Sequence, residues 1–100
     1  MFSCADKKLD GNNGLPACLV SMIEKQKAAM AEPESVTQYS YKGQTVYYVV
    51  APCCDQFNNV YDSDCKFLGS PDGGMEGGGD HKLPDFYKEA TDKKVIWQKK

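Results

Sequence analysis

Hydrophobic residues recur every three or four positions over residues 15–31, and this spacing predicts an amphipathic helix. The stripe consists of Leu15, Leu19, Met22, Ile23, Gln26 and Met30. Pro16 suits the first turn of such a helix, and Asn13 or Gly14 can cap it. Pro33 is expected to end the helix.

After the helix the pattern changes to a period of two, which is typical of β-strands. Residues 36–51 predict a hairpin with a turn at 42–44 and with Thr37, Tyr39 and Tyr41 on one side of the first strand. The β-branched and aromatic run at 45–51 predicts a central strand.

Shorter strands are expected at residues 59–62, 65–68 and 95–97. Residues 69–80 contain six of the nine glycines and therefore predict a loop, and residues 84–90 predict a helical turn. The predicted fold is α+β: one N-terminal helix packed on a small antiparallel β-meander.

The composition allows one folded domain. The chain has 100 residues, of which 41% are hydrophobic and 26% are charged, and these values exclude a disordered chain and a coiled coil. We expect residues 1–14 to form a tether and residues 15–100 to form the domain. All twelve basic residues are lysines and the net charge is −2, so nucleic acid is not an expected partner.

Five cysteines are many for a chain of this length, and they indicate an oxidising compartment. Their spacing lacks the paired ligands of a zinc site, since Cys53 and Cys54 are adjacent and His81 is the only histidine. We therefore expect disulfides that link the helix to the sheet. The four cysteines assigned to them are Cys18, Cys53, Cys54 and Cys65.

Four cysteines allow three pairings, and a bond between the adjacent Cys53 and Cys54 is strained. Two pairings of the four cysteines remain open. Either Cys18 pairs with Cys53 while Cys54 pairs with Cys65, or the two adjacent cysteines exchange partners.

The fifth cysteine, Cys4, follows Ser3 and precedes a polar, charged stretch. A small residue before a cysteine, followed by a polar stretch, is typical of the end of a bacterial lipoprotein signal. We therefore expect Cys4 to be the lipidation site, and lipid to be the only link to a membrane.

An acidic, glycine-rich segment provides the candidate binding residues. These are Asp55, Asp62, Asp72, Gly73, Gly74 and Asp80. A calcium site is one interpretation, because carboxylates and glycine carbonyls supply hard oxygen ligands, although the spacing matches no EF-hand. Its candidate ligands are Asp62, Asp64, Asp72, Glu76 and Asp80. In the other interpretation Asp72 and Asp80 bind local amides within a compact loop.

The sequence contains no recognisable catalytic motif. His81 has no recognisable partner for cysteine or serine catalysis, and the glycine run lacks the features of a phosphate-binding loop. We expect no enzymatic activity and no cofactor. The aromatic residues are expected mainly in the core and on the sheet, or alternatively in a strip that binds a peptide or glycan.

Several short motifs resemble those of a known family. They are Cys53-Cys54-Asp55-Gln56, Val60-Tyr61-Asp62, the glycine loop from Pro71 to Asp80, and Pro84-Asp85-Phe86. Residues 15–90 resemble the uncharacterised small lipoproteins of Bacteroidetes-type bacteria, a domain of unknown function. This chain has His81 after Asp80, where the family pattern has a glycine. The resemblance implies a cell-envelope location and assigns no catalytic residues.

These observations lead us to expect a non-catalytic lipoprotein domain, either secreted or anchored to the cell envelope. It would bind a protein, peptide or glycan through the corner at residues 53–55 and the glycine loop. The alternative is an inhibitor of a secreted hydrolase, which rests on analogy with other small helix-on-sheet domains.

Overall fold

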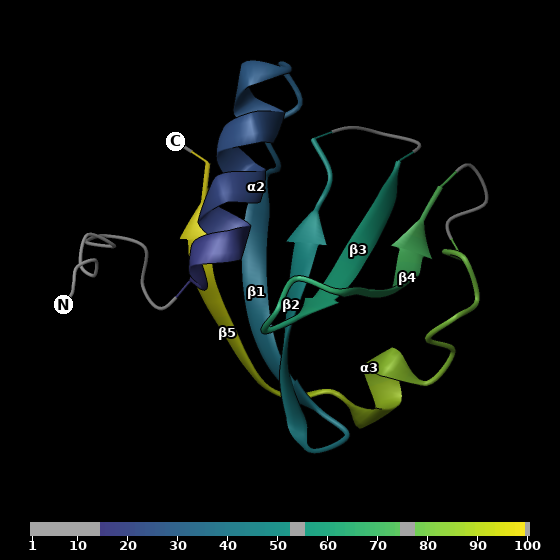
Figure 1. Cartoon of the computed structure of the whole chain (residues 1–100). Coiled ribbons are helices and arrows are strands. Elements are labelled where there is room, and N and C mark those ends of the chain that lie inside the picture. Colours follow the sequence, from purple (N-terminus) through teal and green to yellow (C-terminus); the bar gives the residue numbers. More distant parts are fainter. Residues whose placement is uncertain (1–14, 53–55, 75–77, 100) are drawn as a thin grey trace, which may run out of the picture.

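The computed structural model describes residues 15–52, 56–74 and 78–99, and its elements are shown in Figure 1. The order along the chain is one main helix, four strands, a short helix and a last strand. The elements are α2 (Ala17–Ala28), β1 (Ser35–Tyr41), β2 (Gln44–Val50), β3 (Phe57–Asp62), β4 (Phe67–Gly73), α3 (Phe86–Glu89) and β5 (Thr91–Gln98). The predicted α+β class is confirmed.

The five strands form one antiparallel sheet in the order β4-β3-β2-β1-β5. Strands β1 to β4 form the expected meander, whereas β5 returns to pair with β1. The β1–β2 hairpin closes through Lys42 and Gly43, which both have positive φ (50° and 82°). Such two-residue turns match the twist of antiparallel strands, and they fix the register that places Val36 opposite Val49.

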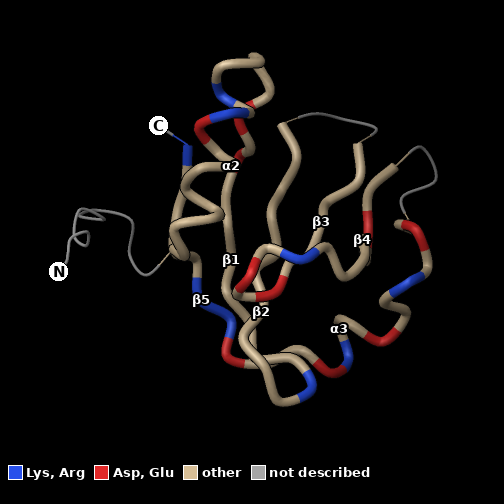
Figure 2. The backbone as a smooth tube through the Cα atoms, viewed as in Figure 1, with Lys and Arg blue, Asp and Glu red and all other residues tan. Residues whose placement is uncertain are grey.

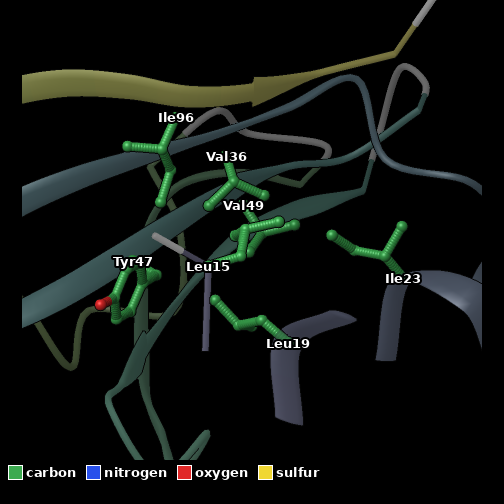
Figure 3. Close-up of a cluster of buried hydrophobic side chains, with 7 residues drawn as sticks. All are labelled: Leu15, Leu19, Ile23, Val36, Tyr47, Val49 and Ile96. Atoms are coloured by element: carbon green, nitrogen blue, oxygen red, sulfur yellow. The ribbon is translucent and has the colours of Figure 1, made fainter. Parts of the chain in front are cut away.

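Helix α2 covers one face of the sheet over the β1 and β5 side (Figure 1). Leu19 and Ile23 of α2, with Leu15 just before the helix, are buried against side chains from three strands (Figure 3). The strand residues in this core are Val36, Tyr47, Val49 and Ile96. The predicted helical stripe and the alternation of the central strands therefore meet in one core.

The opposite face is covered by α3 and the segment before it. Phe86 is fully buried there and contacts the rings of Tyr39, Tyr41 and Tyr48 at centroid distances of 5.2–6.1 Å. The Tyr41 hydroxyl donates a hydrogen bond to the carboxylate of Asp85 at 2.7 Å. The first turn of α3 is thus tied to the β1–β2 hairpin.

Helix α2 is shorter than the predicted 15–31. It ends at Ala28 because Met30 adopts the left-handed conformation with φ 62°. The Met30 amide then bonds the Lys27 carbonyl, and the Ala31 amide bonds the Gln26 carbonyl at 2.7 Å. This is the hydrogen-bond pattern of a Schellman motif, which normally has glycine at that position. Met30 itself is 94% exposed, so its predicted place in the apolar stripe is wrong.

Strands β4 and β5 are longer than expected. Strand β4 extends through Pro71 to Gly73, into the region predicted to be a loop. A proline is tolerated there because β4 is an edge strand, whose outer amides need no partner strand. Strand β5 covers Thr91–Gln98 rather than 95–97 alone.

Neither helix in the described part of the chain has the length and apolar character required to span a membrane.

Candidate binding groove

The disulfide in the described part of the chain joins Cys18 to Cys65, with an S–S distance of 2.05 Å and Cα atoms 6.1 Å apart. Both predicted pairings are therefore wrong, since each gave Cys18 and Cys65 different partners. The turn between β3 and β4 bends over the sheet toward α2, which brings Cys65 to the start of the helix (Figure 1). Cys4, Cys53 and Cys54 lie outside the described residues.

The candidate residues Asp62, Asp72 and Asp80 each accept hydrogen bonds from a different part of the protein. Asp62 accepts hydrogen bonds from the backbone amides of Asp64 and Lys66, both at 2.9 Å, and so orders the β3–β4 turn that carries Cys65. This is a local Asx arrangement. Asp55 lies outside the described residues.

Asp80 binds local amides, as one of the two interpretations predicted. It accepts hydrogen bonds from the amides of Ser70 and Lys82, both at 3.0 Å. Burial works against its charged form, but these amides and the charge of Lys82 hold the pKa of the Asp80 carboxyl below its usual value. Asp80 thereby attaches the segment after the glycine loop to β4.

Asp72 binds side chains rather than amides. Its carboxylate accepts hydrogen bonds from the Tyr48 hydroxyl, at 2.8 and 2.9 Å to its two oxygens, and from the Asn58 amide at 2.9 Å. The Tyr87 hydroxyl of α3 donates a further hydrogen bond. Burial and hydrogen bonding with Tyr87 and Asp72 raise the pKa of the Tyr48 hydroxyl. Asp72 therefore connects β2, β3 and α3.

The carboxylates proposed as calcium ligands are not brought together. Within residues 15–52, 56–74 and 78–99, no group of three or more His, Cys, Asp or Glu side chains could hold a metal ion. Asp62, Asp72 and Asp80 each accept a separate set of protein donors. Glu76 lies outside these ranges.

A groove lies on the helix-covered face of the sheet, between the end of α2 and strands β2 and β3. Its volume is about 400 Å³, within the range of about 300–1,000 Å³ common for small-molecule sites. The lining residues are Gln26, Ala31, Pro33, Val49, Ala51, Pro52, Gln56, Phe57, Asn59 and Tyr61. Helix α2 covers only the β1 and β5 side of this face (Figure 1). The groove is lined by Gln26 near the end of α2 and by residues of β2 and β3.

Gln26 is the lining residue with unmet hydrogen-bonding capacity. Its Oε1 atom is buried and accepts no hydrogen bond from the described protein groups. A buried acceptor without a donor costs about 1–3 kcal/mol. The Schellman motif at the helix end holds this residue, because the Gln26 carbonyl binds the amide of Ala31, another lining residue.

The groove also has aromatic and amide walls. Phe57 is 48% exposed, and Asn59 donates a hydrogen bond from its Nδ2 to the Tyr61 hydroxyl at 3.0 Å. The side chain of Asn59 is held by β4, since its Oδ1 accepts a hydrogen bond from the Ser70 hydroxyl at 2.6 Å. These contacts hold the polar side of the groove in place.

Two of the predicted binding residues, Gly73 and Gly74, support this groove from outside. The Gly74 amide bonds the Gln56 carbonyl at 3.1 Å. A Cβ atom on Gly74 would lie 2.6 Å from Cε1 of Phe57, and one on Gly73 would lie 2.4 Å from the Gln56 carbonyl oxygen. The glycines therefore allow β4 to approach the first residues of β3 closely.

The groove was not predicted as a site, although one signal pointed to it. Gln26 is the polar member of the otherwise apolar helical stripe. A polar residue at a core position is informative, because it needs a partner that the core does not supply. The other lining residues come from separate segments and carry no common sequence motif.

The fold is that of a small α+β domain in which a disulfide links the helix to a hairpin turn, with a groove beside the helix end. The chain belongs to the DUF6970 family, a domain of unknown function whose model matches residues 22–99. Comparisons with curated proteins and with solved structures gave no match. The expected resemblance is confirmed in one respect, namely that the chain is a domain of unknown function.

Proposed function

We propose that this protein is a non-catalytic binding module of the cell envelope whose ligand site is the groove between α2, β2 and β3. The observation that carries the proposal is Gln26, which lines a cavity of about 400 Å³ and whose Oε1 atom is a buried acceptor without a partner among the described groups. Since Oε1 is shielded from solvent in the free protein, a ligand would reach it once the Gln26 amide turns toward the groove. A hydrogen bond donated there would remove the cost of the unmet acceptor.

The chemistry of the lining supports binding rather than catalysis. The described side chains around the groove are amides, aromatic rings and aliphatic groups, with the Tyr61 hydroxyl as their one titratable group. These groups orient a ligand by contact and hydrogen bonding. Residues 52 and 56 both line the groove, so the proposed site adjoins the segment expected to bind a partner.

The envelope location rests on the sequence around Cys4 and on the disulfide. The Cys18–Cys65 bond suits an oxidising compartment. Lipidation at Cys4 would attach the domain through its N-terminal segment. Metabolic labelling of the full-length precursor with a radioactive fatty acid tests this, with Cys4→Ser as the control. Equal labelling of both forms, or of neither, would overturn the lipid anchor.

Binding itself is tested with immobilised panels of oligosaccharides and of peptides. The variant Ala51→Trp fills the groove, whereas Ala28→Trp places the same side chain at an exposed position outside it. We expect the wild type and Ala28→Trp to bind members of a panel and Ala51→Trp to lose them. Retention by Ala51→Trp, or no binding to either panel at millimolar concentration, would contradict the proposal.

A further inference from the structure

We propose that the groove takes an uncharged saccharide, a ligand class that rests on the proposed binding function and makes it specific. Three features of the lining carry this assignment: its aromatic wall, its amide and hydroxyl groups, and its lack of charge. The topology of the sheet supplies a fourth, because it leaves no free strand edge at the groove for an extended peptide.

The aromatic wall presents the ring of Phe57. Almost half of this side chain is exposed, and the close approach of Gly74 to its ring limits where the ring can move. Sugar rings carry C–H groups on their faces, which pack against the electron-rich face of an aromatic ring. Tyr61, on the same strand and the same face, provides a second partly buried ring.

The polar groups suit hydroxyls, which both donate and accept. Oε1 of Gln26 needs a donor. The Tyr61 hydroxyl already accepts from Asn59, so its own hydrogen is directed to a further acceptor. A sugar hydroxyl meets either requirement, and adjacent hydroxyls on one ring meet both.

The lining contains no charged residue among the described positions. Strands β1 and β2 carry no charged residue, as Figure 2 shows. Asp62 is the last residue of β3, at the end of the strand away from Phe57. An anionic ligand such as a uronic acid or phosphate would lose its hydration there without gaining a counter-charge. The charge pattern therefore favours a neutral ligand.

The position of the groove argues against an extended peptide. Peptides that bind sheets usually pair their backbone with a free strand edge. The groove lies on the face of β2 and β3, and both strands are paired on both sides in the order β4-β3-β2-β1. The groove therefore offers no strand edge to which a peptide backbone could pair, and a ligand here is held by side chains.

The test is an NMR titration of the ¹⁵N-labelled full chain with three probes: a neutral hexasaccharide set (cellohexaose, xylohexaose, mannohexaose and N-acetylchitohexaose), oligogalacturonate, and an uncharged decapeptide mixture. We expect a neutral saccharide to shift the amides of Phe57, Asn59 and Tyr61. Phe57→Ala and Gln26→Met should each weaken its affinity at least about tenfold. The matched control Tyr87→Ala removes an exposed aromatic ring from α3 on the opposite face and should leave the affinity unchanged.

The outcomes separate the two proposals. Binding of the peptides or of oligogalacturonate in the groove, without binding of a neutral saccharide, overturns the saccharide assignment and keeps the binding function. A neutral saccharide whose affinity is unaffected by Phe57→Ala and Gln26→Met overturns this site. If none of the three probes shifts the groove amides, both proposals fail. The amide spectrum of each variant shows directly whether it is folded.

Discussion

The Tyr48 hydroxyl in β2 donates a hydrogen bond to the carboxylate of Asp72 in β4, although β3 lies between the two strands. The bond crosses the sheet on the face that carries α3, where the Tyr48 ring packs against Phe86. Asp72 was a candidate binding residue, and the structure shows that its donors come from the protein itself. It stabilises the connection between the sheet and α3.

Tyr48→Phe should therefore destabilise the fold by about 1.5 kcal/mol, because it removes a donor to a charged acceptor while keeping the ring. Urea unfolding of the wild type, Tyr48→Phe, Asp72→Ala and the double variant measures the coupling between the two residues. The cost of Tyr48→Phe should shrink when Asp72 is already absent. An equal cost in both backgrounds would show that the hydrogen bond contributes nothing.

The hydrogen bond from Tyr87 to Asp72 predicts a loss of stability at alkaline pH. Burial of the hydroxyl and its hydrogen bond to Asp72 raise the pKa of Tyr87 to about 12. Since this pKa lies above that of the unfolded chain, near 10, Tyr87 favours folding fully below pH 10, and this contribution is lost as the pH rises toward 12. Unfolding measured between pH 9 and 12 should show a steeper loss of stability for the wild type than for Tyr87→Phe. An equal loss of stability in the wild type and in Tyr87→Phe would contradict the raised pKa of Tyr87.

The Cys18–Cys65 bond closes a loop with a sequence separation of 47 residues. By chain entropy its removal should cost about 3–4 kcal/mol, which lowers Tm by more than about 10 °C in a domain of this size. The double variant Cys18→Ser/Cys65→Ser leaves no thiol from this pair and should melt like either single variant. A double variant that melts with the wild type would show that the bond adds no stability.

The end of α2 offers a stabilising substitution. Met30 has φ 62° and is almost fully exposed, so Met30→Gly relieves the left-handed conformation at little packing cost. We expect a gain of about 1 kcal/mol in the free energy of unfolding. The neighbouring Ala29 has φ −89°, and Ala29→Gly should instead lose about 0.5–1 kcal/mol. Chemical denaturation of both variants checks the opposite signs.

The sequence predicted those parts of the fold that depend on local pattern. The stripe from Leu15 to Ile23 and the alternation around Tyr39 and Val49 each report which face is buried, so the helix, the hairpin and the α+β class could be inferred. The pairing of Cys18 with Cys65 could not be inferred, because it depends on where the β3–β4 turn lies over the sheet. The pairing of β5 with β1 is likewise a long-range choice with no local signal.

The site shows the same division. Gly73 and Gly74 are candidates from the glycine-rich segment, and their lack of a side chain lets β4 approach Gln56 and Phe57 closely. Asp72 and Asp80 are candidates because of their charge, and both carboxylates accept hydrogen bonds from groups of the protein itself. The groove emerges only when the helix end, β2 and β3 are assembled, and Gln26 is the one lining residue whose sequence position was already unusual.

Gln26 should therefore show a trade-off between stability and binding. Gln26→Met keeps the length of the side chain and removes the buried acceptor that has no partner, so it should raise the free energy of unfolding by about 1 kcal/mol. The exposed Gln44 in β2 provides the control, since Gln44→Met removes an amide that already faces solvent and should change stability by less than about 0.5 kcal/mol. Urea unfolding compares the two variants directly. If Gln26→Met were destabilising, the amide would be contributing to the fold of the free protein, and its assignment to ligand binding would lose its physical basis.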